Sequence, residues 1–363
     1  MTMGTTTEGP EAARRVLIYR LGSLGDTLVA LPALHLVARA FPRAERRMLT
    51  NVPVNVKAPP AAAILENTGL VDGFFRYVVG TRSIGELVRL WWTLVSWRPD
   101  VLVYLGSARG VESARRDEWF FRLCGITCQI GVPVKEDMQQ NRWNEEEQAL
   151  EPEAERLGRN IGELGDARLN EAASWDLHLT DAEKARADAA LGPVLAMPMI
   201  AVSVGTKVQS KDWGRENWRA LLGRVAELYP GLVLALSGAP EESDASEFAT
   251  ELWRNLGGGP VVNLCGKLTP RESAAAFRRA RLFVGHDSGP MHLAAAVQTP
   301  CVAIFAARNK PRVWFPYGKQ HRVVYHQTEC WGCGLETCTV ERKRCLTSIT
   351  VDEVVAEIRA ALG

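Results

Sequence analysis

The chain alternates short apolar runs, rich in β-branched residues, with longer stretches of amphipathic character, and this alternation continues through both halves. Short apolar runs bounded by turn residues predict strands, and the longer periodic stretches predict helices. Regular alternation of strand and helix is typical of a parallel sheet covered by helices. We therefore predict an α/β fold with a two-lobed architecture.

The first half of the chain is predicted to hold five strands and three helices. A polar stretch over 135–165 is expected to be a long loop that leads into a helix, and loops of that length are often functional. The predicted strands are 16–20, 47–50, 74–79, 101–105 and 127–131, and the predicted helices are 27–40, 84–97 and 113–124.

The second half repeats the pattern after a stretch bearing Gly and Pro over 191–198, which we interpret as a linker. We predict a disordered lead-in over 1–15, an N-terminal domain over 16–192, a C-terminal domain over 193–350 and a final helix within 351–363. The predicted strands are 199–204, 232–237, 261–264, 282–284 and 301–305, and the predicted helices are 215–228, 242–256, 270–279, 289–296 and 351–362.

The composition indicates a globular protein of more than one domain and does not indicate a function. A chain of 363 residues exceeds one typical domain, and 47% hydrophobic with 23% charged residues is an ordinary globular balance. The net charge of +1 gives no reason to expect nucleic acid as a partner. Residues 1–15 lack the apolar core of a signal peptide, and no apolar run approaches the roughly 18 residues of a membrane span. We expect a cytoplasmic protein with reduced thiols.

The first predicted strand runs into a glycine-bearing turn, Arg20-Leu-Gly-Ser-Leu-Gly-Asp-Thr-Leu28, which contains Gly25 and Asp26. Asp is a preferred residue at a helix N-cap, so Asp26 can be interpreted as a cap. The carboxyl end of a strand is also where open α/β sheets bind ligands, and a carboxylate there can act as a general base on a hydroxyl.

A second turn, Val284-Gly-His-Asp-Ser-Gly-Pro-Met-His292, joins a predicted strand to a predicted helix. Ser288 and Gly289 would offer backbone N–H groups, and His292 would lie one turn further on. A helix start of this kind suits a phosphate, although a well-capped helix with a buried histidine explains the same residues. The order of residues departs from a Gly-x-Ser-x-Gly nucleophile elbow, so a serine hydrolase is not predicted.

Two more strands of the second half end in glycine turns. Gly205, Thr206 and Lys211 follow one strand and suit a phosphate, although an exposed loop lysine is a common alternative. Gly238 follows the next strand. A carboxylate in one half and an anion cradle in the other suggest an enzyme that acts on a phosphorylated donor in a cleft between two domains. A Walker A loop, a full Gly-x-Gly-x-x-Gly fingerprint and an Asp-x-Asp pair are absent from the sequence.

Four of the eight cysteines fall in one polar segment near the C-terminus. Their spacing, with a CxxC followed by two further cysteines, is good metal-ligand spacing, and four thiolates would suit zinc or iron. Redox disulfides or free thiols are the alternative interpretations. The four residues are Cys330, Cys333, Cys338 and Cys345.

Three motifs together resemble glycosyltransferase family 9, which includes the ADP-heptose:lipopolysaccharide heptosyltransferases. They are the Arg20–Asp26 turn with Leu31-Pro-Ala-Leu34 after it, Lys211-x-Trp213, and Asp287-Ser-Gly-Pro-Met-His292. The resemblance implies a GT-B fold, with two Rossmann-like domains facing across a cleft and the final helix over 351–363 packing back on the N-terminal domain. It also implies inverting, metal-independent transfer from a nucleotide sugar, with no cofactor required.

The resemblance gives each candidate residue a role. Asp26 would be the general base on the acceptor, Lys211 would bind the donor phosphates, and Asp287 would contact the donor sugar. The acceptor would lie near 51–60 and 135–156. The remaining donor-binding candidates are Gly25, Gly205, Thr206, Gly238, Ser288, Gly289 and His292.

The expected reaction is therefore heptose transfer from ADP-heptose to a glycan or lipid-linked saccharide in lipopolysaccharide or other surface-glycan synthesis. A different nucleotide-sugar donor, a nucleotide-sugar epimerase, and a non-catalytic, metal-centred assembly protein are the rival hypotheses. Peripheral contact with the inner face of the membrane is a further expectation. The cysteine segment resembles clusters of other family members.

Overall fold

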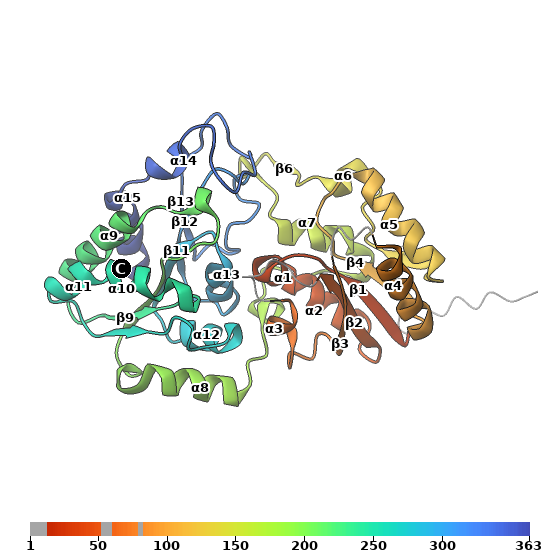
Figure 1. Cartoon of the computed structure of the whole chain (residues 1–363), viewed down its shortest axis with the longest axis horizontal. Coiled ribbons are helices and arrows are strands. Elements are labelled where there is room, and N and C mark those ends of the chain that lie inside the picture. Colours follow the sequence, from red (N-terminus) through yellow and green to blue (C-terminus); the bar gives the residue numbers. More distant parts are fainter. Residues whose placement is uncertain (1–12, 52–59, 79–82) are drawn as a thin grey trace, which may run out of the picture. The chain divides into compact units, whose positions relative to one another are not determined.

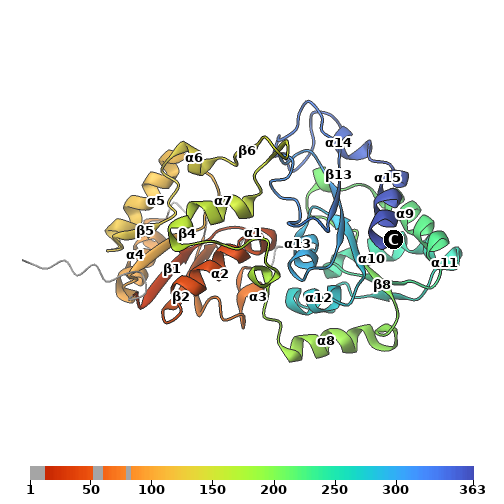
Figure 2. The ribbon, with the colours of Figure 1, turned by 180° about the vertical axis from the view of Figure 1, so that it is seen from behind.

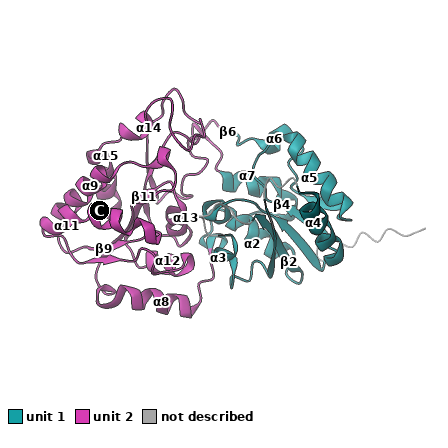
Figure 3. Ribbon diagram, viewed as in Figure 1, with its two compact units in different colours: residues 1–142, 153–175 teal, residues 143–152, 176–363 magenta. Residues whose placement is uncertain are grey.

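A computed structural model describes residues 13–51, 60–78 and 83–363. The chain divides into two compact units (Figure 3): unit 1 comprises residues 1–142 and 153–175, and unit 2 comprises residues 143–152 and 176–363. Most of the predicted lead-in, residues 1–12, lies outside the described residues, and the first strand already begins at Arg15.

The chain leaves unit 1 after Trp175, well before the predicted boundary at residue 192. The helix α8 (Asp181–Leu191) packs on α12 (Pro270–Phe277), and buried Arg271 on α12 bonds the Glu183 carboxylate on α8. The stretch over 191–198, interpreted as a linker, is therefore a turn inside unit 2. Its Gly and Pro end a helix, and they do not separate domains.

Unit 1 is built on a five-stranded parallel sheet in the order β3-β2-β1-β4-β5 (Figures 1 and 2). Its central strand, β1, is apolar from Val16 to Tyr19 because it is buried on both faces. The strands are β1 (Arg15–Tyr19), β2 (Glu45–Asn51), β3 (Gly73–Tyr77), β4 (Val101–Tyr104) and β5 (Cys128–Ile130).

Side chains alternate across the unit 1 sheet. Leu17 and Tyr19 pack in a core with Leu94 of α4 and Phe121 of α5, so these helices cover one face. The helix α2 packs with α7 and with the 3₁₀ turn over 172–175. The helices are α1 (Leu24–Val29), α2 (Leu31–Ala40), α3 (Ala62–Leu65), α4 (Ile84–Trp97), α5 (Val111–Leu123), α6 (Glu136–Gln139) and α7 (Glu153–Asn160).

Unit 2 is built on a six-stranded parallel sheet in the order β10-β9-β8-β11-β12-β13. Its sixth strand, β13 (Arg322–Tyr325), was not predicted, because it lies at the edge and only Val324 is buried. The other strands are β8 (Met199–Ser203), β9 (Val233–Leu236), β10 (Val261–Asn263), β11 (Leu282–His286) and β12 (Cys301–Phe305).

The last helix of the chain, α15 (Val351–Leu362), belongs to unit 2. It packs on α9, β12 and β13, and its side chains Val354, Val355 and Ile358 are part of the unit 2 core. The packing on the N-terminal domain that the resemblance implies is not among these contacts and stays a prediction. The other helices are α9 (Arg215–Leu228), α10 (Ser243–Ala249), α11 (Glu251–Asn255), α13 (Gly289–Ala296) and α14 (Arg344–Thr347).

The polar stretch over 135–165 is more ordered than the long loop that the sequence predicts. It contains α6, a small hairpin of β6 (Trp143–Asn144) and β7 (Ala149–Leu150), and then α7. The hairpin is assigned to unit 2, where Glu147 pairs with Arg312. In the part of the chain that the structure describes, every helix is too short or too polar to span a membrane.

Both large sheets change the direction of strand order at one place. In unit 1 the change lies between β1 and β4, and in unit 2 it lies between β8 and β11. Open α/β sheets bind ligands at the carboxyl ends of strands at such switch points. Asp26 follows β1, Lys211 follows β8 and Asp287 follows β11, so the sequence motifs fall at the two switch points.

Candidate active site

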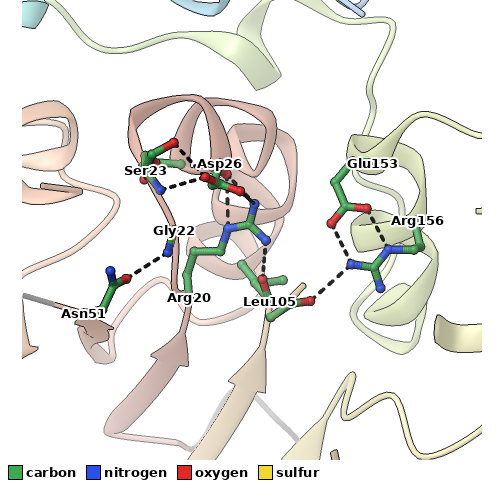
Figure 4. A network of polar contacts seen from close by, with 10 residues as sticks. Arg20, Gly22, Ser23, Asp26, Asn51, Leu105, Glu153 and Arg156 are labelled. Carbon is green, nitrogen blue, oxygen red and sulfur yellow. Dashed lines mark hydrogen bonds and ion pairs between the residues drawn. The ribbon is translucent and has the colours of Figure 1, made fainter. Parts of the chain in front are cut away.

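The carboxylate of Asp26 is held at the first turn of α1 (Figure 4). Its Oδ2 accepts the backbone N–H of Ser23 at 2.7 Å and the Ser23 hydroxyl at 2.8 Å. Ser23 is the N-cap and Asp26 stands three residues further on, which corrects the interpretation of Asp26 itself as the cap. The helix begins at Leu24, earlier than the predicted residue 27, for the same reason.

The buried side chain of Arg20 holds this turn in place through hydrogen bonds. That side chain is 1% exposed, and its guanidinium donates to the Asp26 carbonyl from Nε at 3.1 Å and from Nη2 at 2.5 Å. Nη1 donates to the Leu105 carbonyl, just after β4, at 2.6 Å. One buried cation therefore ties both strands of the switch point to α1, while Asp26 Oδ1 lies 4.0 Å from Nη2. Burial lowers the pKa of Arg20, and the charge of Asp26 opposes that shift.

The turn requires glycine at position 22. Gly22 has φ +137°, and a Cβ there would collide with the Asp26 side chain. The Gly22 N–H donates to Asn51 Oδ1 at 2.9 Å. Gly25, a predicted donor-binding residue, lies in unit 1 within α1, directly before Asp26. Residues 52–59 of the predicted acceptor region lie outside the described residues.

A second buried ion pair supports the loop after β4 (Figure 4). Arg156 bonds Glu153 through two contacts of 2.6 and 2.8 Å, and its Nη2 donates to the Gly106 carbonyl at 3.2 Å. Both side chains are almost fully buried. Arg156, within the predicted acceptor region, is therefore already paired with a carboxylate.

In unit 2, the structure brings together Lys211 and Asp287, which lie far apart in the sequence. Lys211 Nζ lies 2.7 Å from Asp287 Oδ2 and donates to the Asp287 carbonyl at 3.0 Å. Asn309, in the loop after β12, donates to the same Oδ2 at 2.8 Å. Asn309 was missed from the sequence, and its position after a strand next to β11 is the only signal that could have found it.

The helix α13 begins directly after Asp287. Ser288 is its N-cap but makes no side-chain capping bond, because its hydroxyl donates to the His286 carbonyl at 3.3 Å. The N–H groups of Gly289 and Met291 therefore lack a side-chain cap, and such groups suit an anion. His292 is 7% exposed and lies in the first turn of the helix.

His286, the last residue of β11, bonds the loop that carries Lys211 to the unit 2 sheet. Its Nε2 accepts the N–H of Trp213 at 3.1 Å and the indole N–H of Trp218 at 3.3 Å. Burial is the largest cause that lowers the pKa of His286, to about 4. The imidazole is therefore neutral at pH 7, as an acceptor of two N–H groups must be.

The predicted residues Gly205 and Gly238 lie against Glu242, a residue that the sequence did not single out. A Cβ on Gly205 or Gly238 would collide with the Glu242 carboxyl group. Glu242 accepts the Ala239 N–H at 2.8 Å, and burial raises its pKa while Lys207 opposes the shift. Thr206 Oγ1 accepts the Val208 N–H at 3.3 Å. The carboxyl ends of β8 and β9 thus form one glycine-lined site with an acidic group.

The four cysteines of residues 330–345 are free thiols and lie near one another. The charges of Cys330, Cys333 and Cys338 help burial to raise the pKa of Cys345. Backbone N–H groups, first that of Lys343 at 3.2 Å, lower the pKa of Cys338. Among the described residues, which include this segment, no three His, Cys, Asp or Glu side chains form a group that could hold a metal ion. The predicted metal cluster is thus not formed in the structure.

Comparisons with known sequences agree with the motifs. The model of glycosyltransferase family 9 (heptosyltransferase) matches residues 151–343, just over half of the chain. Lipopolysaccharide heptosyltransferase 1 of Pseudomonas aeruginosa is 24% identical over 379 residues, which cover 96% of this chain and 98% of that protein. Lipopolysaccharide heptosyltransferase 3 of Escherichia coli is 38% identical over 99 residues, so the match covers 27% of this chain and only 28% of that relative.

Comparisons with solved structures concern the fold. ADP-heptose lps heptosyltransferase II of E. coli aligns with a TM-score of 0.65 at 19% identity, covering 96% of this chain and 98% of that one. The iron-containing dodecameric glycosyltransferase TibC of enterotoxigenic E. coli H10407 aligns with a TM-score of 0.52 at 15% identity, covering 96% and 76%. The predicted GT-B class of fold, with two parallel α/β sheets, is confirmed.

Proposed function

The chain belongs to glycosyltransferase family 9, and from this membership we propose that it transfers heptose from ADP-heptose to a hydroxyl group of a glycan or lipid-linked saccharide. The relatives named above are heptosyltransferases, and one solved structure is that of an ADP-heptose-dependent enzyme. The observation that carries the proposal is the pairing of Lys211 with Asp287 at the uncapped start of α13.

The donor diphosphate is proposed to bind at the start of α13. The Lys211 ammonium offsets the negative charge that builds up on the diphosphate as the sugar leaves. The backbone N–H groups that follow Ser288, beginning with that of Gly289, donate hydrogen bonds to the same diphosphate. His292 lies beside the diphosphate. Asp287, held by Lys211 and Asn309, contacts the donor sugar.

The nucleoside is proposed to lie at the glycine turns after β8 and β9. Gly205 and Gly238 let the Glu242 carboxyl group lie directly against the two turns, and Thr206 follows Gly205 in the same loop. A carboxylate near the end of a strand in a nucleotide-binding sheet suits a ribose hydroxyl, so Glu242 is assigned this contact. A donor with another nucleotide is the alternative that the assay tests.

The chemical step is proposed to be a single displacement. The Asp26 carboxylate takes the proton of the acceptor hydroxyl, and the acceptor oxygen attacks the anomeric carbon of the donor. The bond from that carbon to the diphosphate oxygen breaks, and ADP leaves with the electron pair. One displacement inverts the anomeric configuration. Lys211 and α13 supply the positive charge in this step, so no metal ion is assigned a part in it.

The acceptor is proposed to belong to lipopolysaccharide or another surface glycan, as the names of the relatives suggest. Because heptosyl acceptors of that kind are anchored in lipid, we propose a cytoplasmic enzyme that meets its acceptor at the inner face of the membrane. Nucleic acid is not proposed as a partner, since the net charge is only +1.

A structural zinc or iron ion is proposed at Cys330, Cys333, Cys338 and Cys345. The thiols do not form a ligand group in the structure, so metal binding would have to draw them together from positions that already lie near one another. Cys338 already accepts backbone N–H groups, which stabilise a thiolate ligand. When bound, the metal would cross-link the segment and take no part in the transfer. TibC, whose fold is similar, is an iron-containing protein. Elemental analysis tests the site: wild type should carry about one zinc or iron per chain, and Cys330→Ser should lose it. Metal-free wild type with free or disulfide-bonded thiols would contradict it.

The proposed reaction is tested by incubating the protein with ADP-heptose and a heptose-accepting core saccharide. We expect ADP release that depends on the acceptor, and a product with the anomeric configuration opposite to that of the donor by NMR. Turnover with UDP- or GDP-sugars alone would move the donor to another nucleotide. Epimerised donor without any acceptor-dependent ADP would contradict the transferase proposal.

A further inference from the structure

The segment over 330–345, named here the cysteine segment, lies against the loop that carries Lys211. Ser210 is 4% exposed; its N–H donates to the Glu336 carbonyl at 3.0 Å and its hydroxyl to the Leu335 carbonyl at 2.6 Å. Gln209 Oε1 accepts the N–H of Cys338 at 3.1 Å. The two residues before Lys211 are therefore both bonded to the cysteine segment.

The residue after Lys211 is held from the same segment. Lys343 Nζ donates to the Asp212 carbonyl at 2.9 Å. Lys343 is itself fixed, because its N–H donates to Cys338 Sγ at 3.2 Å and its backbone adopts φ +63° at the start of α14. Cys338 is thus linked to both sides of Lys211, through Gln209 on one side and through Lys343 on the other.

The cysteine segment also holds the partner of Lys211. Arg308 donates to the Leu335 carbonyl at 2.8 Å and to the Gly334 carbonyl at 2.6 Å, and the Gly334 N–H donates back to the Arg308 carbonyl at 2.9 Å. The next residue, Asn309, donates to Asp287 Oδ2. Both members of the Lys211–Asp287 pair are therefore supported by one segment.

A lysine needs such support if its charge is to meet a phosphate at one place. Its four-carbon side chain loses considerable conformational entropy when it is fixed, and a loop that is already ordered removes part of that loss from the binding step. Within the described residues, η5 (Gln209–Lys211) is a single 3₁₀ turn, too short to order itself. The conformation of this turn is therefore held by its hydrogen bonds to the cysteine segment and by the bond from the Trp213 N–H to His286.

We propose that the cysteine segment is a brace that positions Lys211 and Asp287 for the donor, with Ser210 and Lys343 as its positioning residues. The inference rests on the proposed function, because it assumes that Lys211 binds the donor diphosphate. It adds a role for a segment that the transfer mechanism does not use. Neither positioning residue touches the donor in this assignment; each acts through the main chain beside Lys211.

The test compares Ser210→Ala and Lys343→Met with Lys343→Arg, which keeps the cationic donor, and with Arg342→Met, an exposed neighbour in the same segment. Isothermal titration with ADP and ADP-heptose gives the donor Kd, and initial rates give the acceptor KM. We expect the first two variants to raise the donor Kd about 10-fold while the acceptor KM stays within twofold. Lys343→Arg and Arg342→Met should match wild type within twofold.

Lys211→Ala, measured in parallel, separates a failure of the brace from a failure of the proposed donor site. If Lys211→Ala loses donor affinity while Ser210→Ala and Lys343→Met bind ADP as wild type does, the brace is wrong and the proposed function stands. If Lys211→Ala also binds the donor normally, the proposed donor site fails and the brace fails with it. Thermal melting reports folding; should buried Ser210→Ala not fold, Lys343→Met decides alone.

Discussion

At the scale of single residues, the Asp26 carboxylate holds the start of α1 and is also the proposed general base. Oδ2 is occupied by the N–H and hydroxyl of Ser23, which stabilise the start of α1. The same two bonds fix the direction of the carboxyl group, with the buried guanidinium of Arg20 beneath the turn. A base that must meet one hydroxyl benefits from such a fixed orientation.

Asp26→Asn should lower turnover about 100-fold or more, because the amide cannot take the acceptor proton. The donor Kd should stay at the wild-type value, since Lys211 and Asp287, which are proposed to hold the donor, lie in unit 2. Steady-state rates and titration with ADP measure the two quantities. Glu86→Gln, which removes the first-turn acid of α4, is the matched control and should keep full turnover. Full turnover of Asp26→Asn would exclude it as the base.

His286 makes unit 2 sensitive to acid. Its pKa is about 4 in the folded protein and about 6.5 in an unfolded chain, so the unfolded chain binds the extra proton between these values. The stability that the neutral His286 contributes is therefore fully present above pH 6.5 and is lost as the pH falls towards 4. Between pH 7 and pH 5, the melting temperature of wild type should fall more than that of His286→Gln, which keeps an acceptor for the Trp213 N–H. Equal falls would show that His286 does not titrate in this window.

At the scale of elements, the turn between β1 and α1 depends on a backbone that only glycine adopts easily. Gly22 has a positive φ and stands where a Cβ would meet Asp26. The turn therefore couples backbone conformation directly to the position of the proposed base. Gly69 offers a comparison, because it also has a positive φ but has open space around it.

Gly22→Ala should lower turnover about 10- to 100-fold, because the new methyl group displaces the Asp26 carboxylate. Gly69→Ala should keep wild-type turnover. Gly69→Ala should lose about 1 kcal/mol of unfolding free energy through backbone strain, and Gly22→Ala should lose more because its methyl group also collides with Asp26. Steady-state assays and denaturant titrations measure the two effects. Equal turnover in both variants would show that the close approach at Gly22 has no bearing on the reaction.

Most elements could be predicted from the sequence, because central parallel strands are buried on both faces and read as continuous apolar runs. β8 and β12 were predicted within one residue for this reason. The edge strand β13 was missed because Val324 alone is buried. The apolar stripe of α15 predicted a packed helix but could not say which unit it covers. The turn over 191–198 was mistaken for a linker because Gly and Pro mark both.

At the scale of the whole molecule, the candidate site could be predicted in part. Asp26, Lys211 and Asp287 carry local signals, since each follows a strand and precedes or lies beside a turn. Asn309 and Glu242 also follow strands but belong to no recognisable motif, because their importance comes from parallel strands that place the ends of β8, β9, β11 and β12 side by side. The support of Lys211 by the cysteine segment joins residues more than 120 positions apart, which no local pattern can reveal.

The central proposal gives each unit one role: unit 2 binds a nucleoside-diphosphate sugar through Lys211, and unit 1 supplies the general base. Titration of ADP-heptose into wild type and Lys211→Ala tests it most directly. We predict saturable binding to wild type and a Kd about 10- to 100-fold higher for Lys211→Ala, as expected for loss of a charged contact. Equal affinity of the two proteins, or no binding of ADP-heptose to wild type, would contradict the account.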